Sequence, residues 1–454
     1  MVKVHFLGAS GTVTGSKFYL ETNEQNILVD CGMFQGRKDL RITNRSPLPI
    51  SVPQIDIVLL THGHLDHTGY LPRLVKAGFK GKIVGTAPTL AITRIILLDS
   101  AKINEEEAEL ANSEGYSKHK PALPFYTIED AQDTIGLFKA EELNQWIPLS
   151  ENIQYRFRYN GHIIGSTFIE LDIFGKRFVF SGDVGRPDDI LLEAPVKPEW
   201  ADFLFVESTY GNKIHPENKM EERLVELVKT TIYEKGILLI PSFAVERLQS
   251  LMYLFWQLYK KNKIPNIPIF VDSPMGANVL SIFERFPGWH SLSRKEYDAM
   301  CAHVTIIESY RETWETIDDP RPKIVIAGSG MVTGGRILTY LRQFLDRTNT
   351  SVLLVGYMAE GTRGRTLLEG GQELKIFGKF YPVKAHIYHE ESLSAHADQK
   401  ELLDWMDSIK NIPERVFLIH GEQDALDGFK HKITGVYNWN VHVPKLFETI
   451  ELVF

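Results

Sequence analysis

The sequence predicts an α/β protein with two domains. Its 454 residues exceed what one simple core holds, because chains beyond about 250–300 residues split into domains. From residue 209 onward, short apolar strands alternate with helices, a pattern typical of a parallel sheet with crossover helices. Before that point, histidines and aspartates stand where apolar strands end. We therefore expect a first domain that carries the chemistry and a second, separate α/β domain.

The first part of the chain reads as strands with two helices among them. Apolar runs that alternate or continue, split by turns rich in glycine and asparagine, predict a meander of strands. The expected strands are residues 2–8, 16–22, 26–30, 55–60, 153–160, 167–173 and 177–181, and the expected helices are 69–77 and 88–113.

The middle part predicts a domain inserted into the first one. Its expected strands are 237–240, 267–271, 323–327 and 351–356, and its expected helices are 217–234, 245–260 and 335–345. After it, His396, a strand at 416–419 and His420 resemble the chemistry of the N-terminal part. The predicted domains are therefore residues 1–208 with 387–454, and an inserted domain of residues 209–386.

Composition excludes several classes of protein. The net charge of −8 rules out a whole-protein basic field, so a nucleic-acid site must be a local basic cleft. Cys31 and Cys301 provide neither a disulfide framework nor a thiolate zinc site. No apolar run approaches the ~20 residues of a membrane span, and the N-terminus reads as a strand rather than a signal peptide. We expect a cytoplasmic enzyme without a membrane partner.

The strongest local signal is the run Thr61-His62-Gly63-His64-Leu65-Asp66-His67. Four side chains that bind divalent metals fall within six residues, directly after an apolar strand. His62 and His64 can point one way while Asp66 and His67 point another, a geometry that loads two metals side by side. Such a pair generates a nucleophile and stabilises an in-line displacement at phosphorus. A chance cluster is the weaker explanation, because burying these groups without a partner is costly.

Other potential ligands stand at the ends of apolar strands. Asp30 ends the strand at 26–30, His162 follows 153–160, Asp183 follows 177–181 and His420 follows 416–419. Taken singly, Asp30, His162 and Asp183 are equally well explained as turn or capping residues. Together with the cluster, these residues supply enough ligands to complete two metal sites.

With these residues, the chain resembles hydrolases of the metallo-β-lactamase fold. Asp30, the His-x-His-x-Asp-His run, His162 and Asp183 match that superfamily's first four motifs in order. It resembles more specifically the β-CASP branch, which includes bacterial and archaeal RNases and the nuclease subunit of the cleavage and polyadenylation factor. In that branch, Glu207 matches motif A, His396 motif B and His420 motif C. The resemblance implies a metallo-β-lactamase αββα sandwich with an inserted β-CASP α/β domain.

The resemblance also implies a role for each ligand. His62, His64 and His162 would hold one zinc ion, Asp66, His67 and His420 would hold the other, and Asp183 would bridge them. Asp30 would orient a ligand histidine, because ligand imidazoles usually need a partner for their second nitrogen. A hydroxide between the two Zn2+ ions would attack phosphorus.

Asp66, Glu207 and His396 are the predicted catalytic residues. We expect His396 to donate a proton to the leaving oxygen, with Glu207 raising its pKa and orienting its imidazolium. Metal binding or phosphate binding by His396, and a structural capping role for Glu207, stay open.

Three segments of the inserted domain are candidates for RNA contacts. A glycine-rich turn that opens a helix suits a phosphate, an aromatic side chain after a strand suits base stacking, and a loop with two arginines suits phosphates. A plain strand–helix turn, a core aromatic and a solvated loop are their structural alternatives. The candidate residues are Ser242, Phe243, Gly330, Thr333, Gly334, Gly335, Arg336, Arg363 and Arg365.

The function predicted from these observations is that of a zinc-dependent RNA phosphodiesterase. We expect endonucleolytic cleavage of single-stranded RNA between the two domains, in RNA processing or decay, and a homodimer as the assembly to test. The alternatives are a hydrolase of a small ester, thioester or lactam, and a non-catalytic RNA-binding subunit. A small-substrate hydrolase does not need the inserted domain or the Glu207/His396 pair. A non-catalytic subunit typically loses ligand positions, and none is lost here.

Overall fold

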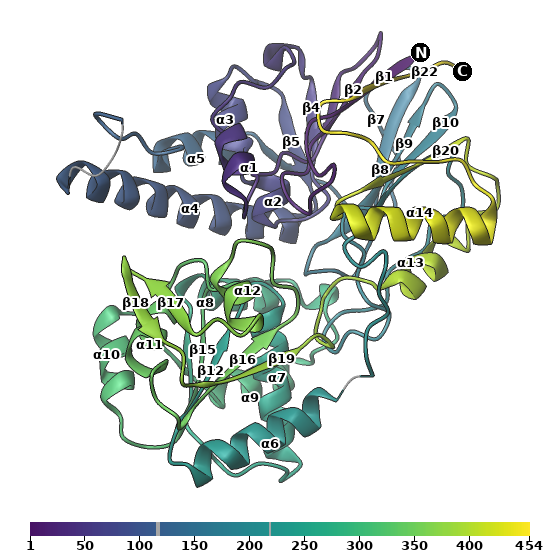
Figure 1. Ribbon diagram of the computed structural model, residues 1–454. Helices are drawn as coiled ribbons and strands as arrows, with labels where there is room; N and C mark the ends of the chain where they lie inside the picture. The colour runs from purple at the N-terminus through teal and green to yellow at the C-terminus, as the bar shows by residue number, and fades with distance from the viewer. Residues whose placement is uncertain (115–118, 218) are drawn as a thin grey trace. The chain divides into compact units, whose positions relative to one another are not determined.

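The computed structural model describes residues 1–114, 119–217 and 219–454. These residues form two compact units (Figure 1). Unit 1 comprises Met1–Ile214 and His396–Phe454, and unit 2 comprises His215–Ala395. Among the residues described, no helix has both the length and the apolar composition needed to cross a membrane.

Unit 1 contains two seven-stranded sheets, and the first is built from the N-terminal part of the chain. Its four strands at one edge are antiparallel, as expected for a meander, and the remaining pairs are parallel. In spatial order the strands are β22 (Thr449–Leu452), β1 (Val2–Phe6), β2 (Phe18–Glu21), β3 (Ile27–Val29), β4 (Ile57–Leu59), β5 (Lys82–Gly85) and β6 (Phe138–Ala140). The C-terminal strand β22 thus lies at the edge of this sheet, beside β1.

The second sheet joins the middle of the sequence to its C-terminal part. Its order is β21 (Val441–His442), β20 (Arg415–Ile419), β11 (Phe203–Glu207), β10 (Lys176–Phe180), β9 (Thr167–Ile173), β8 (Ile153–Tyr159) and β7 (Ile147–Pro148). Strands β11 and β20 are parallel neighbours, with Glu207 paired to Ile419. The end of β11 and the residue after β20 are therefore adjacent, although more than 200 residues separate them in sequence.

The apolar core of unit 1 lies between the two sheets. Inward-facing side chains of both sheets form one buried cluster, in which the rings of Phe180 and Phe205 stack 4.1 Å apart and those of Phe205 and Phe417 4.7 Å apart. Helices cover the outer faces (Figure 1). On the first sheet these are α3 (Leu71–Lys76), α4 (Ala87–Ser113) and α5 (Ile128–Ile135); on the second, α13 (Gln399–Met406) and α14 (Gln423–Tyr437). This confirms the predicted αββα sandwich.

Unit 2 is built on a six-stranded sheet in which every pair of neighbours is parallel, as predicted. Its order is β14 (Thr305–Ile306), β13 (Ile269–Asp272), β15 (Lys323–Ala327), β12 (Ile237–Pro241), β16 (Thr350–Val355) and β19 (His386–Glu390). The predicted helices are α6 (Met220–Tyr233), α7 (Arg247–Lys260) and α11 (Ile337–Phe344). Residue 218 of the predicted helix 217–234 lies outside the described residues.

Several elements of unit 2 were not predicted. They are the two edge strands β14 and β19, the helices α8 (Pro274–Arg285), α9 (Arg294–Ala302), α10 (Tyr310–Asp318) and α12 (Arg363–Leu368), and the hairpin of β17 (Glu373–Ile376) and β18 (Lys379–Pro382). A local signal existed for two of them, because Ser293 with Glu296 and Ser309 with Glu312 form capping boxes at the starts of α9 and α10.

The compact units divide at slightly different residues from the predicted domains. Strand β19 pairs with β16 from His386 to Glu390, which places the residues after 387 with the inserted unit. Tyr210 forms a β-bridge with Asp398, which keeps the segment after Glu207 in unit 1.

Candidate metal centre

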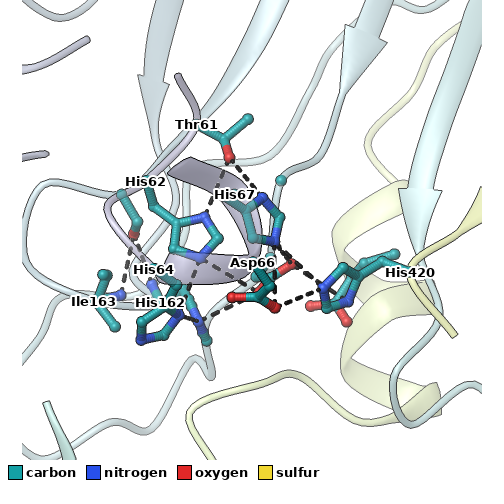
Figure 2. A network of polar contacts seen from close by, with 12 residues as sticks. Thr61, His62, His64, Asp66, His67, His162, Ile163 and His420 are labelled. Carbon is teal, nitrogen blue, oxygen red and sulfur yellow. Dashed lines mark hydrogen bonds and ion pairs between the residues drawn. The ribbon is translucent and has the colours of Figure 1, made fainter. Parts of the chain in front are cut away.

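The predicted ligands converge where strands of both sheets of unit 1 end. Asp30 follows β3, the segment His62–His67 follows β4 and includes the short helix α2 (Leu65–Thr68), His162 follows β8, Asp183 follows β10 and His420 follows β20. Asp30 and His420 have positive φ values of 57° and 51°, which turn the chain sharply after the strand. Figure 2 shows the resulting group of imidazoles and carboxylates.

Three imidazoles and one carboxylate form the first group of potential ligands. His64 Nδ1 lies 3.0 Å from His62 Nε2 and 3.3 Å from His162 Nε2. Asp183 Oδ2 lies 3.5 Å from each of those two Nε2 atoms. A tetrahedral site with metal–ligand distances of about 2.0–2.1 Å places its ligand atoms about 3.3 Å apart. The spacing of this group therefore fits a single zinc-sized cation.

The second group contains Asp66, His67 and His420. Its Nε2 atoms lie 3.3 Å apart, and Asp66 Oδ2 lies 3.4 Å from His420 Nε2 and 4.0 Å from His67 Nε2. Asp183 Oδ1 lies 3.4 Å from His67 Nε2. This group is somewhat wider than the first and is compatible with a second cation.

Asp183 lies between the two groups and presents one oxygen to each. Its side chain is buried, and Oδ1 accepts no hydrogen bond from a described residue. A buried carboxylate oxygen without a donor is costly unless a cation meets it. This atom is the observation in the structure that best supports metal binding.

Two of the imidazoles are held in the neutral form, whereas His67 is not: burial lowers its pKa, but the carboxylates of Asp183 and Asp30 outweigh burial and raise this pKa well above its ordinary value. Burial lowers the pKa of His62 well below its ordinary value and that of His64 to about 4, so both imidazoles are neutral, the form that binds metal. Burial works against ionisation of Asp66, but the hydrogen bond with His420 and nearby imidazoles lower its pKa to about 2. Burial also opposes ionisation of Asp183, yet the neighbouring imidazoles, His420 foremost, hold its pKa well below its usual value. These carboxylates require positive charge here, from an imidazolium or a metal cation.

A second layer of hydrogen bonds orients the ligand imidazoles. Asp30 Oδ2 accepts a 2.7 Å hydrogen bond from His67 Nδ1, and Asp30 also accepts bonds of 2.8 Å from the backbone N–H and the hydroxyl of Thr61. The Thr61 hydroxyl lies 3.1 Å from His62 Nδ1, and that of Thr209 lies 3.2 Å from His420 Nδ1. With Nδ1 bound in this way, Nε2 of each ring is directed to the centre.

The orienting role of Asp30 was predicted from the sequence, whereas those of Thr61 and Thr209 were not. Thr61 directly precedes the first histidine of the cluster, and Thr209 follows Glu207 by two positions. Their position next to a motif was the only sign in the sequence that these residues contact a ligand. It is a weak sign, since a threonine beside a motif is usually a local turn or cap residue.

Glu207 and His396 form a pair beside Asp183. Glu207 is fully buried, and its Oε1 accepts hydrogen bonds from Val184 N at 2.7 Å and from His396 Nδ1 at 3.2 Å. Burial lowers the pKa of His396, but the carboxylates of Glu207 and Asp183 outweigh it and raise this pKa to about 8. His396 Nδ1 lies 4.0 Å from Asp183 Oδ2. The imidazole is thus held in its protonated form near neutral pH, beside the potential ligands.

A buried lysine that the sequence analysis did not single out supports the ligand loop. Lys17 Nζ donates to the carbonyl oxygens of Gly15 at 2.9 Å and Gly32 at 2.6 Å, and it lies over the Phe34 ring. The neighbouring Ser16 N donates to the carbonyl of Asp66. A Cβ on Gly32 would lie 1.5 Å from that same carbonyl oxygen. Lys17 therefore ties together the segments that contact the Asp66 backbone.

The predicted RNA-contact residues lie in unit 2, most of them at the carboxyl ends of β12 and β15. Ser242 N donates to Ala327 O, and the Phe243 ring lies against Gly330. The hydroxyls of Ser329 and Thr333 are 3.0 Å apart. The turn continues through Gly334 and Gly335 to Arg336, which precedes α11.

The three predicted arginines have different surroundings. The Arg336 guanidinium stacks on the Tyr310 ring at 3.7 Å and lies 3.5 Å from Asp272 Oδ1. Arg363 donates to the carbonyls of Thr333 and Lys375, so it braces the glycine-rich turn. Arg365 pairs with Glu369 at 2.6 Å.

Three family models match successive parts of the chain. The metallo-beta-lactamase superfamily matches residues 11–137, the Beta-Casp domain residues 248–367, and the Zn-dependent metallo-hydrolase RNA specificity domain residues 381–444. Fold, ligand geometry and these matches define a metallo-hydrolase of the metallo-β-lactamase superfamily. Within that superfamily, the chain belongs to the β-CASP family, as the relatives described next also indicate.

The chain is similar over most of its length to several characterised relatives. Ribonuclease TTHA0252 of Thermus thermophilus is 33% identical, over 92% of this chain and 93% of its own. Transcription termination factor FttA of Methanocaldococcus jannaschii and Integrator complex subunit 11 of Gallus gallus are each 28% identical over 99% of this chain, and over 72% and 73% of their own lengths. A crystal structure of a protein of unknown function from Enterococcus faecalis V583 has the same fold, with a TM-score of 0.54, 13% identity and coverage of 99% and 100%.

The contact between Asp30 and His67 predicts an effect on metal affinity. In Asp30→Asn, the amide N–H2 group would face either the Thr61 donors or His67 Nδ1–H, so one hydrogen bond is replaced by a donor–donor contact. We expect metal affinity to fall by about 10–100-fold, measured by competition with a chromogenic chelator. Asp39→Asn, an exposed aspartate of α1 (Lys38–Thr43), is the control. Equal affinities of the two variants would show that Asp30 does not position the ligand.

The buried Lys17 predicts a pH dependence of stability. Burial lowers its pKa from 10.5 to about 8, so between about pH 8 and 10.5 the unfolded chain binds more protons than the folded one. The free energy of unfolding of the wild type, relative to Lys17→Met, should therefore rise across this window by on the order of 2 kcal/mol. Urea unfolding at a series of pH values measures it. As a control, the difference in free energy of unfolding between the wild type and Lys38→Met, at an exposed lysine, should not change with pH. A difference between the wild type and Lys17→Met that stays constant with pH would contradict the prediction.

Proposed function

We propose that this protein is a zinc-dependent ribonuclease that cuts single-stranded RNA endonucleolytically, in RNA processing or decay. The observation that carries the proposal is the Asp183 carboxylate, which presents one oxygen to each of two imidazole groups beside the Glu207–His396 pair. The name of the ribonuclease relative and the RNA specificity domain matched at the C-terminal end support RNA as the substrate. A cytoplasmic location and a homodimer stay predictions.

The residues present fit two zinc ions. His62, His64 and His162 would hold one, Asp66, His67 and His420 the other, with Asp183 shared between them. Nitrogen and oxygen donors at tetrahedral spacing are what zinc prefers. Bound divalent cations of this kind supply a hydroxide nucleophile near neutral pH and stabilise negative charge at phosphorus.

The chain's own residues supply the proton for the leaving group. Glu207 Oε1 accepts the hydrogen bond from His396 Nδ1, and the carboxylates around the ring keep it protonated near neutral pH. We assign His396 Nε2 as the atom that donates to the leaving oxygen. Glu207 acts by orienting the ring and by stabilising its positive charge.

RNA contacts are proposed for unit 2. Ser242, Phe243, Gly330, Thr333, Gly334, Gly335, Arg336, Arg363 and Arg365 are the assigned residues. Arg336 is the strongest of them, because Tyr310 and Asp272 hold its guanidinium in one orientation. Arg363 also acts by holding the Thr333 carbonyl and with it the turn.

The proposal predicts chelator-sensitive cleavage of RNA. End-labelled single-stranded RNA should be cut by the metal-loaded protein, and a chelator should abolish the cut. Asp66→Ala should lower the rate by roughly 100-fold or more, whereas Asp39→Ala, an exposed aspartate, should not. Internal products would distinguish endonuclease from exonuclease. RNA left intact by the zinc- or manganese-loaded protein would favour a small-ester hydrolase or a non-catalytic RNA-binding subunit.

The role of His396 predicts a dependence on the leaving group. His396→Ala should slow RNA cleavage by about 10²–10⁴-fold, but should slow hydrolysis of the p-nitrophenyl ester of a nucleotide much less, because p-nitrophenolate leaves without a proton. Asp66→Ala should slow both reactions, and the exposed His431→Ala neither. Equal losses on both substrates for His396→Ala would instead indicate metal or phosphate binding by this residue.

A further inference from the structure

A surface of unit 2 that extends from Arg336 along α10 and α11 to the β17–β18 hairpin carries aromatic rings and cations. We define the aromatic–cation stripe as Tyr310, Arg336, Trp314, Arg342 and Phe377, extended by the pair Lys375 and Phe380. Tyr310 and Trp314 lie on α10, Arg336 and Arg342 at the start and near the end of α11, and the other three on the β17–β18 hairpin. In Figure 1, these elements lie together beside the sheet of unit 2.

Cation–π contacts link the members of the stripe in three groups. The Arg336 guanidinium lies 3.7 Å from the centre of the Tyr310 ring. The Arg342 guanidinium lies 5.6 Å from the Trp314 ring and 6.0 Å from the Phe377 ring, so it connects α10 to the hairpin. Lys375 and Phe380 are cross-strand partners, with the ammonium 5.7 Å from the ring.

The aromatic rings of the stripe are not core residues. The exposed fractions are 39% for Trp314, 58% for Phe377 and 60% for Tyr310, whereas the inward residues of the same elements, such as Ile317, Leu341 and Ile376, pack against the apolar core of unit 2. Several exposed aromatic rings on neighbouring elements of one unit indicate an interaction site.

The backbone of Phe377 points to the same conclusion. Phe377 and Gly378 form the two-residue turn of the hairpin, with φ values of 47° and 79°. A turn with positive φ at both positions favours asparagine and glycine, and a bulky aromatic residue there is strained. Strain kept at an exposed position indicates a use for the side chain.

The charges around the stripe favour a polyanion. In the part of the chain that the structure describes, neither the Arg342 guanidinium nor the Lys375 ammonium forms an ion pair. Two of the three carboxylates of α10 are engaged locally, because Glu312 accepts the capping hydrogen bond of Ser309 N and Glu315 pairs with Arg311; the third, Asp318, lies at the C-terminal end of the helix. The stripe therefore offers unpaired positive charge between aromatic faces.

We propose that the aromatic–cation stripe binds single-stranded RNA, with bases stacked on Trp314, Phe377 and Phe380 and phosphates held by Arg342 and Lys375. Aromatic faces that stack bases beside cations that hold phosphates are how proteins grip single strands without reading sequence. The assignment rests on the proposed function for the identity of the polyanion. It adds to that function a strand-holding surface that shares only Arg336 with the residues assigned at the carboxyl ends of β12 and β15.

Binding of a labelled, unstructured single-stranded RNA, followed by fluorescence anisotropy in the cleavage-impaired Asp66→Ala background, tests the stripe. Trp314→Ala and Phe377→Ala should each weaken affinity by roughly fivefold or more. Arg342→Gln should weaken affinity and reduce the slope of log affinity against log salt by about 0.7.

The matched controls are Tyr233→Ala and Arg294→Gln. Tyr233 is 88% exposed on α6, and Arg294 on α9 is an exposed arginine that also lies over a tyrosine ring, that of Tyr297. Both controls should bind RNA as the unsubstituted chain does. Equal effects of control and stripe variants, or affinity unchanged in the stripe variants, would overturn the proposal.

Hydrolysis of bis(p-nitrophenyl) phosphate separates the stripe from the metal chemistry. In an otherwise unsubstituted chain, the stripe variants should hydrolyse this small diester at the normal rate. If the chain cleaves RNA but the stripe variants bind RNA as tightly as the unsubstituted chain, the stripe proposal is overturned and the ribonuclease proposal stands. If the stripe variants weaken RNA binding but the unsubstituted chain does not cleave RNA, the stripe proposal stands and the ribonuclease proposal is overturned. Stripe variants that change the oligomeric state, measured by light scattering, but leave RNA affinity unchanged would identify a second copy of the chain as the occupant and overturn the proposal.

Discussion

Charge compensation around the buried carboxylate of Asp183 is the constraint on which the active site depends. Its Oδ2 faces His62 and His162, and its Oδ1 faces His67. A carboxylate buried among imidazoles is stable only with positive charge close to both oxygens. This requirement explains why strands from both ends of unit 1 must meet. The pairing of β11 with β20 brings His420, from the C-terminal segment, to ligands delivered by the N-terminal sheet.

The orientation of the ligand imidazoles is set by hydrogen bonds from residues that are not themselves ligands. Asp30 fixes His67 and Thr61, and Thr61 in turn contacts His62, so one carboxylate aligns ligands of both groups. On the other side of this region, Lys17 donates a hydrogen bond to the carbonyl of Gly32, and Gly32 lies directly against the backbone carbonyl of Asp66. A ligand ring held at Nδ1 keeps its Nε2 lone pair in place before any cation arrives, which reduces the ordering that binding requires.

The sequence predicted the fold class and the convergence of ligands because both follow short-range rules. Apolar strands that end at a histidine or aspartate can be recognised in the sequence, and the order of the family motifs added His420 to the second metal site in particular. Thr61, Thr209 and Lys17 were not visible in this way. Their roles depend on which ring nitrogen faces the centre and on which loops meet, and both are set by tertiary packing. The same holds for the hairpin of β17 and β18, whose inward residues Leu374 and Ile376 become core only by packing against α12 and the other members of the unit 2 cluster.

In the proposed function, unit 1 cleaves the phosphodiester bond and unit 2 discriminates between substrates, for a chemical reason. A pair of cations with a proton donor activates any suitably placed phosphodiester, because none of the groups around Asp183 reads a base. Discrimination must then come from groups that sense the polymer: stacking on rings and contacts with successive phosphates. Unit 2 provides such groups at the turn before Arg336 and along α10 and the hairpin. Stacking needs unpaired bases with open faces, so a surface of this composition favours single strands over duplexes. In the function we propose, the preference for single-stranded RNA is therefore a property of unit 2 rather than of the metal ligands.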